Sequence, residues 1–116
     1  MKHKESVNQS KFCTLARWLH PEIVLMSIPN GGKRNAREAI TLKKEGLLAG
    51  APDIFVAEPN SFSHGLFLEF KEKENGKITK QQGLIHTQLR EKGYSVAIVY
   101  NCDEAMKFLE SYLGQR

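Results

Sequence analysis

The strand–helix–strand order of residues 66–100 is the strongest constraint on how this chain can fold. Residues 66–71 alternate in hydropathy as a strand does, and residues 95–100 form a continuous apolar run. Between them, residues 79–93 have the spacing of a helix. A helix that crosses between two strands of one sheet makes a right-handed connection and leaves the strands parallel. The sequence therefore predicts at least one parallel strand pair.

Turn and capping residues predict where the elements begin and end. Asn35 with Glu38, and Thr79 with Gln82, have capping-box spacing at the starts of two helices, and Asn101 caps a last one. The expected elements are helix 6–20, buried strand 23–28, a short basic helix 35–46, hairpin strands 53–57 and 66–71, helix 79–93, buried strand 95–100 and a last helix from 101. This order predicts the α/β class, with a mixed central sheet and helices on both faces.

Helical spacing also predicts which side chains face the core. On the first helix the stripe contains Glu5 and Gln9 together with Phe12, Ala16 and Leu19. The later helices direct these apolar residues inward: Leu84, Ile85 and Leu89, then Ala105, Phe108, Leu109 and Tyr112. Trp18 falls beside the first stripe and is either a core residue or an interface anchor.

Composition and charge limit the class of protein. The 116 residues are 41% hydrophobic, which suits one globular domain over residues 1–116. No apolar run approaches the length of a membrane span, and no leader pattern follows the first residues, so we expect a cytoplasmic protein with two free cysteines, Cys13 and Cys102. Residues 1–46 carry nine Lys or Arg against four Asp or Glu, and residues 47–116 carry eight against nine. This asymmetry suits a polyanion partner, and a mixed solvated surface is the equal alternative.

Three charged residues of the hairpin can carry chemistry. Asp53 opens one strand, Glu69 lies near the end of the next, and the period of two places Lys71 on the same face as Glu69. An inward-facing acid in so apolar a strand needs a partner, and a divalent cation with oxygen ligands is a natural one. A cross-strand salt bridge is the simpler interpretation of the same spacing.

The motifs resemble a known nuclease family. Pro52-Asp53 followed by Glu69-Phe70-Lys71 resembles the PD-(D/E)XK nuclease signature. Further motifs occur in the order found in the virus-type replication-repair nuclease (VRR-NUC) domain: Glu5-x-x-x-Gln9, Pro29-Asn30-Gly31-Gly32, Leu47-x-x-Gly50-x-Pro52-Asp53 and Gly76-Lys77-Ile78-Thr79-x-x-Gln82. The resemblance spans nearly the whole chain and implies a restriction-endonuclease-like, three-layer fold. Small single-domain members of this kind are carried by phages and prophages.

The resemblance implies roles at matching positions. Asp53 and Glu69 would bind Mg²⁺ or Mn²⁺ together with the backbone carbonyl of Phe70, and Lys71 would act on the attacking water or stabilise the phosphorus centre. Glu5 would complete the metal shell or bind a second ion. The family glutamine, which orients the water or the DNA backbone, would be Gln82, or Gln81 if the register differs by one.

Several of these residues have a second interpretation. Ser6 and Gln9 also have capping-box spacing, which would leave Glu5 just outside the first helix. Gln82 has a structural task already as the capping partner of Thr79. The four histidines have no metal-ligand spacing and are expected at the surface or at helix ends. Glu72 and Glu74, with Lys73 and Lys77, are expected in a solvated turn.

The predicted function is therefore a metal-dependent DNA endonuclease that acts in replication or repair and selects branched or junction DNA. A basic loop and helix start would contact DNA phosphates through Asn30, Lys33, Arg34 and Arg37, or would serve solubility only. A non-cleaving nucleic-acid-binding module is the alternative function. A homodimer in a bacterial or phage-infected cell is expected, with Trp18, Phe62 and Leu113 as candidate interface residues, and a monomer is the alternative.

Overall fold

The computed structural model describes residues 2–29, 35–73 and 77–116. Its elements are α1 (Lys2–Leu19), β1 (Leu25–Ser27), α2 (Ala36–Lys44), β2 (Ile54–Val56), β3 (Leu66–Phe70), α3 (Lys80–Glu91), β4 (Ser95–Val99) and α4 (Cys102–Leu113). The predicted order of elements is thus correct throughout. The main differences lie at the element ends, because α1 begins four residues before the expected start and β1 is half the expected length.

The four strands form one sheet in the order β1-β2-β3-β4. β1 pairs with β2, and β2 with β3, in antiparallel fashion, whereas β3 and β4 are parallel with α3 as their crossover. The predicted hairpin and the predicted parallel pair are both confirmed. The sheet is mixed, as expected from the strand–helix–strand order.

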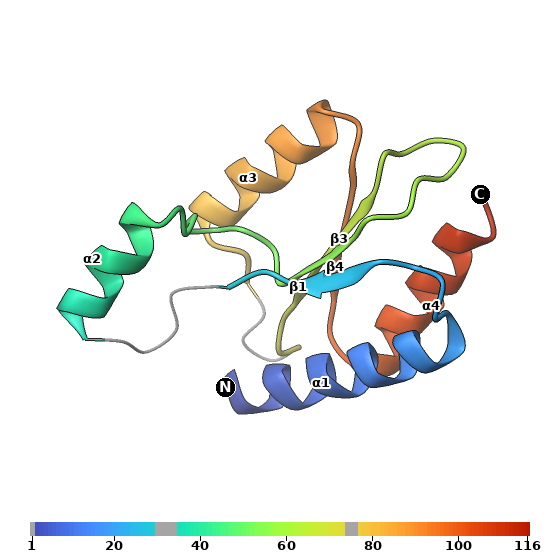
Figure 1. Ribbon diagram of the computed structural model, residues 1–116, viewed down its shortest axis with the longest axis horizontal. Coiled ribbons are helices and arrows are strands. Elements are labelled where there is room, and N and C mark those ends of the chain that lie inside the picture. The colour runs from blue at the N-terminus through green and yellow to red at the C-terminus, as the bar shows by residue number, and fades with distance from the viewer. Residues whose placement is uncertain (1, 30–34, 74–76) are drawn as a thin grey trace.

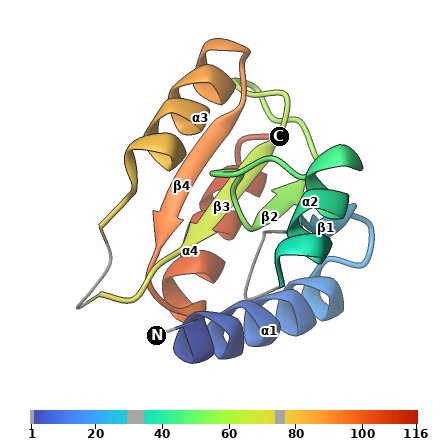
Figure 2. The same ribbon diagram turned by 90° about the vertical axis from the view of Figure 1, so that its left-hand side faces the viewer.

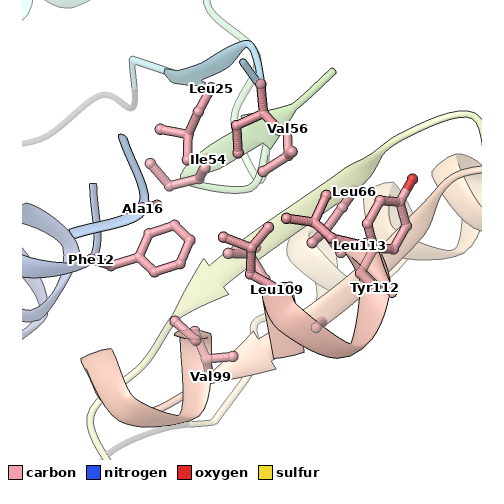
Figure 3. Close-up of a cluster of buried hydrophobic side chains, with 14 of the residues drawn as sticks. Phe12, Ala16, Leu25, Ile54, Val56, Leu66, Val99, Leu109, Tyr112 and Leu113 are labelled. Atoms are coloured by element: carbon pink, nitrogen blue, oxygen red, sulfur yellow. The ribbon is translucent and has the colours of Figure 1, made fainter. Parts of the chain in front are cut away.

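The helices cover the two faces of this sheet. In Figure 1, α3 lies above the sheet, and α1 and α4 lie below it. Figure 2 shows the same layers from the side, with α4 behind the strands and α2 standing toward the viewer. Figure 3 shows the lower layer, where Phe12 and Ala16 of α1 and Leu109 of α4 meet Ile54 and Leu66 of the sheet. All five side chains are fully buried.

Strand alternation divides the sheet side chains between the layers. Leu66, Leu68 and Phe70 of β3 belong to the α1/α4 core, and Phe67 and Glu69 face the side of α3. The first face therefore supplies the main core, and the opposite face carries both the Glu69 carboxylate and Phe67, whose ring stacks on Phe55.

Some expected core positions are wrong. Strand β1 is buried only in part: Leu25 lies in the core, whereas Met26 is exposed, because β1 forms an edge of the sheet. Leu19, Leu84 and Phe108 also lie at the surface, because each helix buries a narrower stripe than the apolar pattern suggested. Leu113 is buried in the main core, so it is unavailable as an interface residue.

Helix α2 is set apart from this body, with no buried residue. Its predicted capping box between Asn35 and Glu38 is present. The segment that follows returns to the sheet through Gly50, which has a φ of +88°. A Cβ atom added at this glycine would lie only 2.8 Å from the Gln81 side chain. This close approach brings the entry to β2 against the start of α3. No helix among the described residues is long and apolar enough to cross a membrane.

Candidate active site

The β2–β3 register brings two carboxylates face to face. Ile54 pairs with Leu68, so Asp53, just before β2, lies across from Glu69. The Asp53 carboxylate is held there, because the backbone N–H of Phe70 donates to its Oδ2 at 2.7 Å. Both acids are buried, with Asp53 9% and Glu69 2% exposed. The structure thus brings together the two acids that the motif spacing predicted.

Helix α3 supplies two polar partners to Glu69. The Gln82 side chain donates from Nε2 to Glu69 Oε2 at 3.3 Å. One turn later, His86 Nε2 lies 3.2 Å from Glu69 Oε1. Each oxygen of this carboxylate therefore has its own partner on the helix that covers this face of the sheet.

The environment of Glu69 strongly favours its protonated form. Burial and the neighbouring charge of Asp53 raise the pKa of Glu69 from its usual 4.5 to about 8, and a hydrogen bond with the Asp53 side chain acts in the same direction. Lys71 opposes this shift, and Glu5 adds to it. At neutral pH, Glu69 is therefore protonated next to Asp53. A bound cation would take the place of that proton.

The remaining predicted residues surround this pair. Lys71 directly follows β3, and its backbone N–H donates to the carbonyl of Val99 at 2.9 Å, which fixes where the strand ends. Glu5 lies in the first turn of α1 and is half-buried, so the alternative that places it outside the helix is wrong. The Phe70 side chain is buried in the α1/α4 core, so only its backbone is left for the site.

Gln82 makes the predicted capping contacts and also contacts Glu69. Its Oε1 accepts from the Thr79 backbone N–H at 3.0 Å, which completes the predicted capping box, while its Nε2 donates to Glu69. Gln81 is exposed and packs against Gly50. Of the two glutamines, Gln82 is the one with a hydrogen bond to Glu69.

His86 is the residue that the sequence interpretation missed. It was expected at the surface, yet it is 1% exposed and contacts Glu69. Burial, with the positive charges of Arg90 and Lys71, lowers the pKa of His86, so the imidazole is neutral at pH 7. Its spacing of four from Gln82 was a usable signal, because residues one turn apart share a helix face. Glu72 is also buried, contrary to the expected solvated turn.

The paired acids fit a divalent cation in a simple form. In the described part of the chain, no three or more His, Cys, Asp or Glu residues cluster in a way that could hold a metal. Mg²⁺ binds through one or two carboxylates and keeps several waters, so Asp53 and Glu69 are a sufficient donor set. Asp53 and Glu69 are buried next to each other, so their charges repel when both are ionised. A divalent cation bound between them would relieve this repulsion.

The predicted DNA contacts are less well defined. Arg37 lies on the exposed surface of α2, beside Glu38 and Thr41, as a phosphate contact requires. Asn30, Lys33 and Arg34 fall outside the described residues.

The layers, the mixed sheet and the acids at the hairpin define an α/β protein of the restriction-endonuclease-like fold. No family model and no curated protein matches the sequence. Among solved structures, the chain is similar to a "VRR_NUC domain protein", with a TM-score of 0.72 and 20% identity over 93% of this chain and 89% of that one. The fold that the motifs implied is therefore confirmed.

The raised pKa of Glu69 predicts a pH-dependent stability. Between pH 4.5 and about 8, folded Glu69 keeps a proton that the unfolded chain has released. The free energy of unfolding therefore falls by up to about 1.4 kcal/mol for each unit that the pH rises in this window. We expect the metal-free protein to be less stable at pH 8 than at pH 5, and Glu69→Gln to flatten this slope. Urea unfolding in EDTA at several pH values measures both, and parallel curves for the two proteins would contradict the expectation.

Proposed function

We propose that this protein is a metal-dependent DNA endonuclease that hydrolyses phosphodiester bonds. The observation that carries the proposal is the burial of Asp53 against Glu69 beside Lys71, on a sheet face that packing alone would fill with apolar side chains. The similar fold of a protein called a VRR_NUC domain protein supports the same reaction class.

The residues divide the chemistry among them. Asp53, Glu69 and the backbone carbonyl of Phe70 would hold Mg²⁺ or Mn²⁺, which when bound supplies a Lewis acid at a nonbridging phosphate oxygen. Lys71 is the cation next to the acids, and it orients or deprotonates the attacking water or stabilises charge at phosphorus. Gln82 orients the water or the DNA backbone, and Glu5 completes the metal shell or binds a second ion.

Removing the acids is expected to separate binding from cleavage. Asp53→Ala and Glu69→Ala should abolish cleavage and leave DNA binding equal or tighter, because neither acid attracts phosphate and Asp53→Ala removes a negative charge from the site. Lys71→Ala should abolish cleavage and weaken binding slightly. Labelled linear, flapped and four-way-junction DNA, incubated with and without Mn²⁺, gives the measurement. Glu91→Ala, on the far end of α3, is the control.

The same assay tests the competing function. Wild-type protein that binds every substrate and cuts none, with any metal, would support a non-cleaving nucleic-acid-binding module. The variants then differ from wild type in affinity alone.

The basic segment before and within α2 is proposed to contact DNA phosphates. Each neutralisation at Lys33, Arg34 or Arg37 should reduce the slope of log affinity against log salt by about one. Lys107→Ala, on α4 across the sheet, is the matched control and should keep the wild-type slope. A triple Ala variant with an unchanged slope would return this segment to a solubility role.

A branched substrate favours a paired enzyme. One site per chain serves one strand at a time, so we propose a two-fold symmetric dimer acting on junction DNA. Trp18, on α1, is 77% exposed and lines a surface hollow with Leu15, and Phe62 is 80% exposed. These two residues are the remaining interface candidates.

Mixed dimers are expected to reveal the pairing. Wild-type subunits mixed with Asp53→Ala subunits should yield nicked junctions in place of paired cuts, because each active site serves one strand. Light scattering at micromolar concentration gives the mass of wild type and of Trp18→Ala. A monomeric wild-type mass, both free and on junction DNA, would exclude the paired model.

A further inference from the structure

His86 is buried against the site yet has no part in the proposed chemistry. It lies on the inner side of α3, and Glu69 is the partner that its Nε2 faces. Burying a histidine without a partner is unfavourable, so its position depends on this contact. The question is what the contact does for Glu69.

Helix α3, which carries Gln82 and His86, is held in place at both ends. Gln82 is held by its capping hydrogen bonds with Thr79, and the turn after it is anchored by the buried Ile85. Farther along the helix, the Arg90 side chain donates to the carbonyl of Val96 on β4 at 2.9 Å. The helix therefore cannot move relative to the sheet without breaking several contacts. Donors on such a helix hold a carboxylate in one orientation.

The chemistry of the donors matters as much as their placement. The Gln82 amide offers Glu69 an N–H without a positive charge, and a neutral imidazole does the same in its Nε2–H tautomer. A Lys or Arg in the same place would neutralise Glu69 and compete with a cation for it. Neutral donors instead orient the carboxylate and leave its charge for the ion.

We propose that His86 is a positioning residue that, together with Gln82, holds the Glu69 carboxylate in the orientation that binds a divalent cation. The inference rests on the metal centre of the proposed function. Residues that hydrogen-bond to a metal ligand fix the orientation of that ligand, and their loss typically lowers metal affinity 10- to 100-fold. His86 itself touches neither the DNA nor the ion in this proposal.

Two amide substitutions test the donor at a fixed polarity. The amide nitrogen of Gln can reach the position of the imidazole Nε2, whereas that of Asn is one bond shorter. We expect His86→Gln to keep Mn²⁺ affinity within about threefold of wild type, and His86→Asn and His86→Leu to weaken it by about 10- to 100-fold. Isothermal titration calorimetry with Mn²⁺ alone gives the affinities. His64→Leu, an exposed histidine away from the acids, is the control.

Cleavage against metal concentration gives the second readout. His86→Asn should need more Mn²⁺ for half-maximal cleavage and should approach the wild-type rate at saturation, since no reacting group is lost. Circular dichroism in EDTA checks that each variant is folded, and the Gln and Asn pair carries the test if Leu is not tolerated.

The outcomes separate this inference from the proposed function. Wild type that binds Mn²⁺ without cutting any DNA would overturn the nuclease proposal, while a weakened His86→Asn would still support the positioning role. Equal Mn²⁺ affinity in wild type, His86→Asn and His86→Leu would overturn the positioning role alone. A wild type that binds no Mn²⁺ would overturn both.

Discussion

The antiparallel register between β2 and β3 is the constraint on which the site depends. It sets Asp53 across from Glu69, and a shift of one residue would turn every side chain of the strand to the other face. Leu66, Leu68 and Phe70 prevent that shift, because their burial in the α1/α4 core fixes which face of β3 points down. The main core therefore fixes the strand that carries Glu69, and with it the position of both acids.

The parallel pairing of β3 with β4 sets the second half of the site. A parallel pair needs a crossover, and the crossover here is α3, which must lie over the face that carries Glu69. Thr79 begins this helix, so Gln82 falls in its first turn and His86 one turn later. The same chain topology that makes the sheet mixed thus brings two polar partners to one carboxylate.

Much of this arrangement could be predicted because it depends on short sequence patterns. The capping boxes at Asn35 and Thr79 predicted two helix starts, and the period of two along β3 predicted which face Glu69 occupies. His86 was missed because its spacing from Gln82 shows that the two share a helix face but not what that face covers, and the partner is 17 residues away in the sequence. Exposure at Phe108 and Leu84 was missed for a related reason, since the width of a buried stripe depends on neighbours that a local pattern does not contain.

Stability alone does not explain the composition of the α3 side of the sheet. Replacing a buried charged pair by well-packed apolar residues is often neutral or stabilising, whereas two buried acids in contact oppose each other's ionisation. This repulsion and the burial of Glu69 raise its pKa, so at neutral pH the folded protein keeps a proton on Glu69 that the unfolded chain has released. Two further polar side chains contact the same carboxylate, and His86 is buried while Gln82 is partly buried. A chain that places this much polarity under a helix gives up stability at that point, and unfavourable local choices of this kind mark functional sites.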